Sequence, residues 1–231
     1  MYKLMKFKLI IGLLFSINML PGQALLSGNL FIDKFNHLPV SDAVKNGEYE
    51  GSPFLIDSFV EGILRIKNEA TYKMPMRYNL YGDVLDVKYK GRDLVLTPND
   101  IIEVIEIKNH KLVTTLYEFN GTRNKGFLFL LDTGKVNLLM KKNISFEDWR
   151  PARAQEAGPK LARFKESLDA FFLQSGTKVT QIKNIKDLPG LFSSNRSKVA
   201  DFIKKNKTKL KQEKLIELVK YYNSLQVESK S

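Results

Sequence analysis

The chain has 231 residues, none of which is cysteine and only two of which are histidine, at positions 37 and 110. The lack of cysteine excludes disulfides, thiolate metal sites and a cysteine nucleophile. Two histidines this far apart are too few for a histidine-based zinc site. Hydrophobic residues make up 43% of the chain, enough to form a core. We therefore expect a folded protein with no metal or other cofactor, and these absences favour a protein that is not an enzyme.

The amino-terminal segment has the pattern of an export signal. Three lysines lie among the first eight residues, a mostly apolar run follows over residues 9–20, and residues 21–24 end in Ala24 after a small glycine. This order is typical of a secretory signal peptide, so we predict that residues 1–24 are removed by cleavage after Ala24. The apolar run is shorter than the roughly 20 residues that a membrane-spanning helix needs. We expect an exported protein of the periplasm, cell surface or extracellular space, with no transmembrane span in the mature chain.

Charge divides the remaining chain into two unequal parts. Residues 25–175 contain 21 basic and 20 acidic residues, whereas residues 176–231 contain 13 basic and 5 acidic ones. The excess positive charge of the mature chain therefore lies almost entirely in its last quarter. The spacing of hydrophobic residues changes in the same region, which indicates a change of architecture.

Residues 25–183 are predicted to form an antiparallel β domain. Short segments rich in β-branched and aromatic residues are separated by Gly, Asn and Asp about every ten residues, a pattern typical of an antiparallel sandwich or open barrel. No stretch between them is long enough for helical crossovers, which argues against a parallel sheet. The predicted strands are 58–66, 71–80, 84–89, 94–96, 101–107, 112–119, 127–131 and 136–140, followed by a hairpin over 170–183.

Residues 142–160 lack a clear period and contain Pro151 and Pro159. We interpret them as a connector with one helical turn over 152–157. Trp149, the only tryptophan, is expected to close one end of the β core.

Residues 184–231 are predicted to form a basic helical segment. Val199, Phe202 and Ile203 have helical spacing within 197–205, a second stripe runs through 209–225, and Thr208 is the expected N-cap of the second helix. The fold class is therefore α+β, an antiparallel β-sandwich or open barrel with a short C-terminal two-helix cap. Both apolar stripes should pack on the sheet, so Phe202→Asp is expected to destabilise the whole fold.

Two motifs resemble catalytic loops but lack the residues that such loops require. Asp132-Thr133-Gly134 follows an apolar strand, as in aspartic proteases, but Lys135 comes next and the chain has no second copy. We interpret it as a β-turn. Residues 121–126 have the glycine spacing of a phosphate-binding loop, but a strand follows where that loop needs Lys, Ser or Thr and then a helix. We therefore predict no nucleotide site.

The carboxylates do not form an obvious catalytic pair. Glu103 and Glu106 have an odd separation within one predicted strand, so they lie on opposite faces, and Asp83 and Asp86 have the same spacing. A carboxylate site assembled by the fold from distant segments remains an alternative.

The lysines of the tail form the one candidate binding site. They surround the junction of the two predicted helices and would attract lipid phosphates or acidic glycans. Nucleic acid is disfavoured, because no aromatic residues are interleaved with them and the chain is expected to be exported. The alternative is an ordinary solvated helix surface. The candidate residues are Lys204, Lys205, Lys207, Lys209, Lys211 and Lys214.

Several segments carry a resemblance to known proteins. They are the strand segment 76–81, the hairpin over 126–136, Phe192 with the lysine-rich helix after it, and Tyr221-Tyr222-Asn223. On these residues the chain resembles an uncharacterised family of small exported β-rich proteins of Bacteroidetes-type Gram-negative bacteria. The resemblance implies a β-rich exported domain with a helical end, and it implies no substrate, cofactor or site residue.

The leading functional hypothesis is therefore an exported cell-envelope protein that acts by binding, or as an accessory to an unidentified envelope partner. One alternative is an exported hydrolase with a carboxylate site assembled by the fold. The other is a polyanion-binding protein that uses the basic C-terminal helices.

Overall fold

The computed structural model describes residues 31–33, 49–68, 71–154 and 157–228. The predicted signal peptide lies outside these residues. Within them the strands are β1 (Phe31–Asp33), β2 (Tyr49–Glu50), β3 (Val60–Ile66), β4 (Thr71–Asn79), β5 (Val84–Tyr89), β6 (Arg92–Leu96), β7 (Ile102–Ile107), β8 (His110–Phe119), β9 (Thr122–Asp132), β10 (Asn137–Glu147), β11 (Ala162–Ser175) and β12 (Lys178–Ile182). The helices are α2 (Leu188–Leu191), α3 (Arg196–Lys205) and α4 (Gln212–Glu228).

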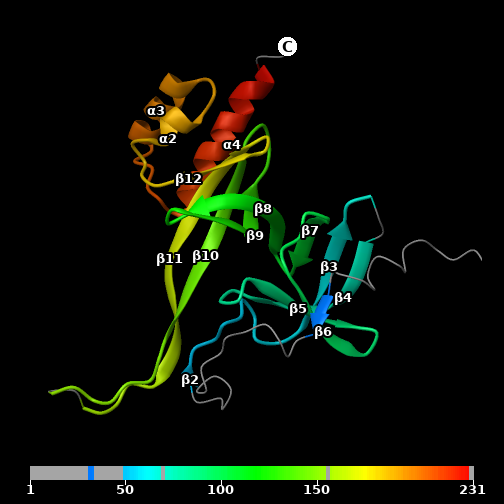
Figure 1. The fold of residues 1–231 in the computed structure, drawn as a ribbon. Coiled ribbons are helices and arrows are strands. Elements are labelled where there is room, and N and C mark those ends of the chain that lie inside the picture. The colour runs from blue at the N-terminus through cyan, green and yellow to red at the C-terminus, as the bar shows by residue number, and fades with distance from the viewer. Residues whose placement is uncertain (1–30, 34–48, 69–70, 155–156, 229–231) are drawn as a thin grey trace, which may run out of the picture.

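The strands form one open sheet, and the helices follow them at its end (Figure 1). Their order is β1-β6-β5-β4-β3-β7-β8-β9-β10-β11-β12, and every pair along this path is antiparallel. The short strand β2 adds a parallel pairing to β11, which makes the sheet mixed. The α+β fold class predicted from the sequence is confirmed.

Short turns join most neighbours in this order, because antiparallel neighbours need only tight connections. The pairs β3–β7 and β1–β6 are exceptions, because their strands are not consecutive in the sequence. Between β8 and β9, Asn120 and Gly121 both have positive φ, at 51° and 75°. These angles fit a type I′ hairpin turn, whose twist matches that of the flanking strands and which favours Asn followed by Gly. The sequence analysis expects Gly, Asn and Asp to separate the strands, and Asn120-Gly121 does so between β8 and β9.

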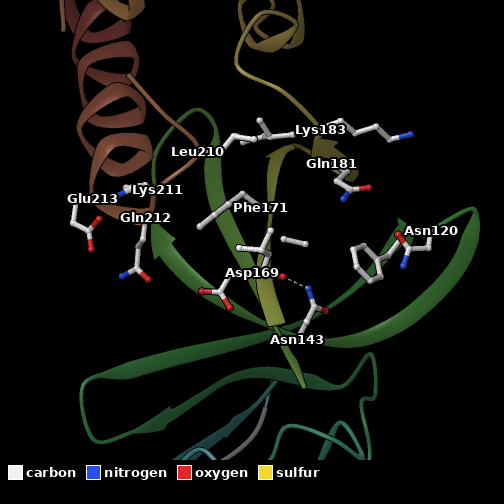
Figure 2. A pocket seen from close by; sticks show the side chains of 14 residues that line it. Asn120, Asn143, Asp169, Phe171, Gln181, Lys183, Leu210, Lys211, Gln212 and Glu213 are labelled. Carbon is white, nitrogen blue, oxygen red and sulfur yellow. Dashed lines mark hydrogen bonds between the residues drawn. The ribbon is translucent and has the colours of Figure 1, made fainter. Parts of the chain in front are cut away.

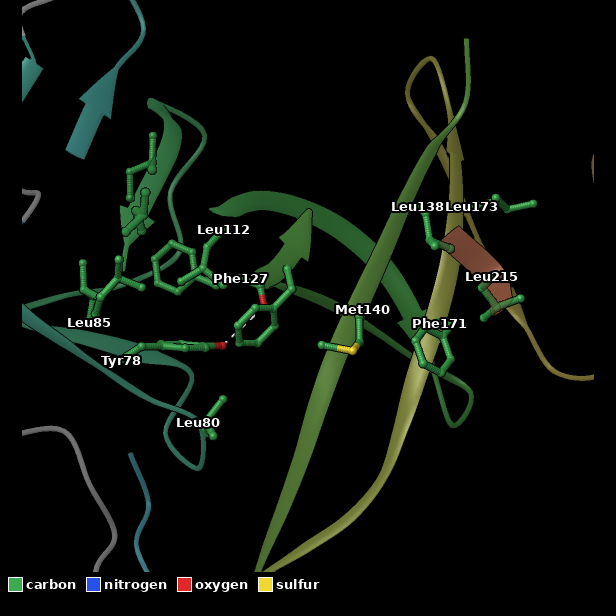
Figure 3. Packing of buried hydrophobic residues seen from close by; sticks show 14 of the residues in the cluster. Tyr78, Leu80, Leu85, Leu112, Phe127, Leu138, Met140, Phe171, Leu173 and Leu215 are labelled. Carbon is green, nitrogen blue, oxygen red and sulfur yellow. Dashed lines mark hydrogen bonds between the residues drawn. The ribbon is translucent and has the colours of Figure 1, made fainter. Parts of the chain in front are cut away.

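The main core is continuous from the first half of the sheet to the helices. Figure 3 shows it passing from Tyr78 and Leu85 through Phe127 and Met140 to Leu215 of α4. A second, smaller cluster is centred on Leu128, Leu139 and Phe172, which alternate along β9, β10 and β11 with members of the main core. Strands β9–β11 therefore bury side chains on both faces.

The two predicted helices are present as α3 and α4, and the shorter α2 precedes them. Val199 of α3 is fully buried in the main core, whereas Phe202 is half-buried and stacks on Tyr221 of α4 with ring centroids 4.5 Å apart. Phe202 still packs against the main core, but as a partly buried side chain. Among the described residues, no helix combines the length and the hydropathy that a membrane crossing requires.

The predicted N-cap is wrong. Helix α4 begins at Gln212, four residues after Thr208, because residues 206–211 form an irregular connection first. Thr208 is instead a buried residue within this connection. Its backbone N–H donates to the carbonyl of Ile203 at 3.1 Å.

The predicted connector over 142–160 is wrong in its first part. Strand β10 continues to Glu147, and Arg150 and Lys160 still exchange two backbone hydrogen bonds of 3.1 and 3.0 Å beyond it. No helical turn occurs over the described residues of 152–157. Trp149 is 53% exposed and therefore does not close the core. The hairpin over 170–183 is confirmed, with its first strand, β11, starting earlier, at Ala162.

Candidate functional site

A groove of about 700 Å³ lies between the second half of the sheet and the start of α4 (Figure 2). The β8–β9 turn, β10, β11, the end of β12 and the α3–α4 connection all contribute side chains to it. These segments are far apart in sequence, so the groove exists only in the folded chain. Its apolar lining includes Phe119, Leu168 and Leu210, of which Leu168 is 92% exposed.

A β-bulge shapes the floor of the groove. Lys141 pairs with Ala170, but Asn143 pairs with Ser167, so β11 has one more residue than β10 at this point. A bulge bends its strand and changes the direction of its side chains. The side-chain amide of Asn143 donates to the carbonyl of Leu168 at 2.7 Å and stabilises the bulge. The bulge explains why a leucine in a long strand projects into solvent.

Side-chain amides supply much of the polar lining. Asn120, Asn143, Gln181 and Gln212 come from four different segments, and Figure 2 shows them around the groove. Among the described residues, the amides of Asn120, Gln181 and Gln212 have no hydrogen-bond partner in the protein. Each amide can both donate and accept, so these groups can bind hydroxyl groups of a ligand.

The charged side chains that line the groove are equal in number for the two signs. Asp169 and Glu213 supply two carboxylates, and Lys183 and Lys211 supply two ammonium groups. Burial raises the pKa of the Asp169 carboxyl above its ordinary value, although nearby Lys142 lowers it. A ligand with a large net charge of either sign would therefore meet repulsion as well as attraction.

The candidate lysines of the tail gather around the α3–α4 connection. Lys204 and Lys205 end α3, where positive charge is favourable at the carboxyl end of a helix. Lys207 and Lys209 are exposed in the connection, and Lys211 lines the groove. Polyanion binding by these residues stays a prediction.

Lys214 differs from the other candidates, because it already has a partner on its own helix. Its ammonium group donates to Glu217 at 3.0 and 2.8 Å. Lys214 therefore contributes less to an external anion site than its position in the sequence indicates.

The predicted turn at Asp132-Thr133-Gly134 is present, and α4 holds it in place. The side-chain amide of Asn223 donates to the carbonyl of Val136 at 3.1 Å, and its oxygen accepts from the Val136 N–H at 3.2 Å. A Cβ on Gly134 would lie 2.4 Å from the Asn223 amide nitrogen, so a larger residue here would have to displace the Asn223 side chain. The turn is thus a structural contact between sheet and helix, and Asn223 was not identifiable as its partner from the sequence.

Asp83 belongs to a buried polar cluster between the two halves of the sheet. Its carboxylate accepts from the Tyr78 hydroxyl at 2.6 Å and from the Phe127 N–H at 3.2 Å, and the Lys141 ammonium lies 3.9 Å away. Burial raises the pKa of the Asp83 carboxyl and also that of Tyr78. A Cβ on Gly126 would lie 2.3 Å from the carboxylate. The space between Asp83 and Gly126 is therefore too small even for a methyl group, and a substrate does not fit there.

Of the other acidic residues singled out in the sequence, Asp86 and Glu106 form ion pairs. Two guanidinium nitrogens of Arg77 lie 3.0 Å from Asp86. Glu106 lies 3.1 Å from Arg65, and Glu103 is exposed on the same strand. Within the described residues no group of three or more acidic or histidine side chains has the arrangement of a metal site.

No family model, curated protein or solved structure matches this chain.

Proposed function

We propose that this chain is an exported, non-enzymatic binding protein of the cell envelope, and that the groove between β11 and α4 holds a neutral glycan. The groove itself is the observation that supports this proposal. Its three amides that have no partner among the described residues, those of Asn120, Gln181 and Gln212, can pair with sugar hydroxyls. Phe119 and exposed Leu168 of the same lining offer apolar surface to sugar C–H groups. The two carboxylates and two ammonium groups cancel, which favours an uncharged ligand.

The test is a glycan array that carries neutral and acidic oligosaccharides, probed with the full chain and two variants. Leu168→Trp should abolish binding by filling the groove, and it should leave folding intact because Leu168 is almost fully exposed. Leu116→Trp is the matched control, since Leu116 is also exposed on a strand but lies outside the groove lining. Binding to neutral glycans that only Leu168→Trp removes supports the proposal. Binding only to acidic glycans, or no binding, contradicts it.

A hydrolase is the second candidate, and one observation favours it. Asp169 and Glu213 line the same groove, and burial raises the pKa of the Asp169 carboxyl, as a general acid requires. On this hypothesis Asp169→Asn would abolish turnover of a bound glycan while leaving its binding largely intact. Product formation by the unaltered protein, followed by chromatography of each glycan that binds, distinguishes the two candidates.

A further inference from the structure

The far end of the β10–β11 hairpin extends away from the rest of the molecule (Figure 1). Its two faces differ because side chains alternate along each strand. On one face Phe146 and Phe164 are 4.9 Å apart between ring centroids, and Tyr49 and Tyr81 each lie 5.3 Å from Phe164. This aromatic group joins that face to the body of the protein.

The opposite face is exposed and ends in an apolar pair. Glu147 pairs with Arg163, and Arg150 bridges to Lys160, so the same register places Trp149 opposite Leu161. Directly opposed residues of an antiparallel pair project on the same face, and their side chains meet. Trp149 is 53% exposed and Leu161 is 51% exposed. The hairpin therefore presents a tryptophan and a leucine together to solvent.

Charged groups surround this pair. Glu147 on the same face is bonded to Arg163 at 2.7 Å and to Lys165 at 3.3 Å. Nearer the tip, residues 148–161 contain three basic and two acidic residues, so their net charge is +1. The basic residues are Arg150, Arg153 and Lys160, and the acidic ones are Asp148 and Glu156.

We propose that Trp149 and Leu161 anchor this hairpin in the headgroup region of a membrane that contains anionic lipids. Tryptophan prefers this region because its ring is apolar and its indole N–H still reaches polar groups. The positive charge of the tip is complementary to anionic headgroups. Because the hairpin is extended, its tip can touch a flat membrane while the groove stays away from the membrane. This anchor therefore does not depend on the proposed glycan binding.

Trp149 reports on its own insertion, because it is the only tryptophan in the chain. The full chain is mixed with vesicles of phosphatidylcholine alone, or of phosphatidylcholine with phosphatidylglycerol, and tryptophan emission is recorded. We expect a shift to shorter wavelength with the anionic vesicles, and quenching when their lipids carry bromine on the acyl chains. Attachment through another segment, including the predicted leader, would leave Trp149 in water and its emission unchanged.

Leu161→Glu should abolish this shift, because it places a carboxylate beside Trp149 at the membrane surface. The matched control is Leu116→Glu, which changes a similarly exposed leucine on β8 and should retain the shift. Both variants should keep the circular dichroism of the parent protein, since both positions are exposed. Unchanged emission with anionic vesicles overturns the proposal. So does a shift that occurs without lipid as protein concentration rises, which would assign the tip to self-association.

Discussion

Strands β3–β7 and strands β8–β12 belong to one sheet but differ in regularity and in the use of charge. In β3–β7 the turns are short, and acidic residues such as Asp86 and Glu106 form ion pairs with arginines of neighbouring strands. In β8–β12 a bulge interrupts the longest strand pair, and the carboxylate of Asp169 on β11 lines a groove together with Glu213 of α4. The comparison indicates that the first half is a scaffold, whereas the second half carries the surfaces that are available to a ligand.

The largest effect is expected where the helices meet the sheet. Val199→Asp places a carboxylate in the main core without a partner, so it should cost more than about 3 kcal/mol of the free energy of unfolding. Phe202→Asp should cost only about 1 kcal/mol, because Phe202 is half-buried and a carboxylate there can reach water. Urea unfolding followed by circular dichroism measures both. Equal losses for the two variants would show that α3 packs differently.

The next effect concerns the contact between α4 and the turn after β9. Asn223→Ala removes two hydrogen bonds to the Val136 backbone, so we expect a loss of about 1–3 kcal/mol. Ser224→Ala is the matched control on the neighbouring residue, because its hydroxyl bonds only within α4, to Tyr221, at 2.7 Å. The same unfolding experiment tests this pair. If Ser224→Ala costs as much as Asn223→Ala, the turn contact is not the source of the stability.

The regular half of the molecule could be predicted from the sequence almost to the residue. Strand β5 was expected over 84–89 and extends over Val84–Tyr89, because alternating residues and Gly-containing turns at both ends define it locally. The hairpin turn at Asn120-Gly121 was predictable for the same reason, since its backbone angles depend on two adjacent residues.

The irregular half was not predictable in the same way. The groove depends on a bulge at Leu168, which is set by cross-strand register and has no marker in the local sequence. Residues 143–147 lie in a segment that lacks a strand-like pattern, but each of them pairs with β11, so tertiary pairing overrides local preference. Asn223 contacts a turn nearly ninety residues earlier in the chain, a contact that only the folded structure brings about.

The pH dependence of stability should differ in sign between two carboxylates. Burial raises the pKa of the Asp83 carboxyl above its ordinary 3.8. The folded protein therefore keeps this carboxyl protonated up to a higher pH than the unfolded chain does. The contribution of Asp83 to stability therefore falls as the pH rises from 3.8 through the raised pKa. The hydrogen bond from Arg163 lowers the pKa of Glu147 below 4.5, so its contribution is present above 4.5 and is lost as the pH falls through the lowered value.

Asp83→Asn should remove the loss of stability as the pH rises, and Glu147→Gln should remove the loss of stability as the pH falls. Urea unfolding at several values between about pH 3 and pH 7 measures both slopes. A variant of Asp83 whose stability has the same pH profile as the parent protein would mean that the buried cluster does not perturb this carboxyl. The Glu147 variant serves as the control of opposite sign, because its ion pairs are at the surface of the hairpin.

The smallest effect on stability is expected at the basic α3–α4 connection. Replacing Lys204, Lys205, Lys207 and Lys209 together with glutamine should change the free energy of unfolding by no more than about 0.5 kcal/mol, because all four are exposed. Binding to phosphatidylglycerol vesicles should nevertheless weaken, and most clearly at low salt, where screening is least. The matched control neutralises four exposed lysines of the other half of the sheet, at positions 67, 73, 90 and 108.

Sedimentation of the protein with vesicles measures this binding, and Trp149 emission measures the hairpin separately. If the four lysines form an anion site, their replacement reduces sedimentation while the emission shift of the remaining bound protein is retained. If the variant of the four connection lysines and the control variant lose vesicle binding equally, the total charge of the protein decides this binding. No single surface would then be favoured. The connection lies beside the middle of β11, next to residues 168–171, whereas the hairpin tip lies at the far end of the β10–β11 pair in Figure 1. The two measurements therefore assign membrane contact to one of these places or to both.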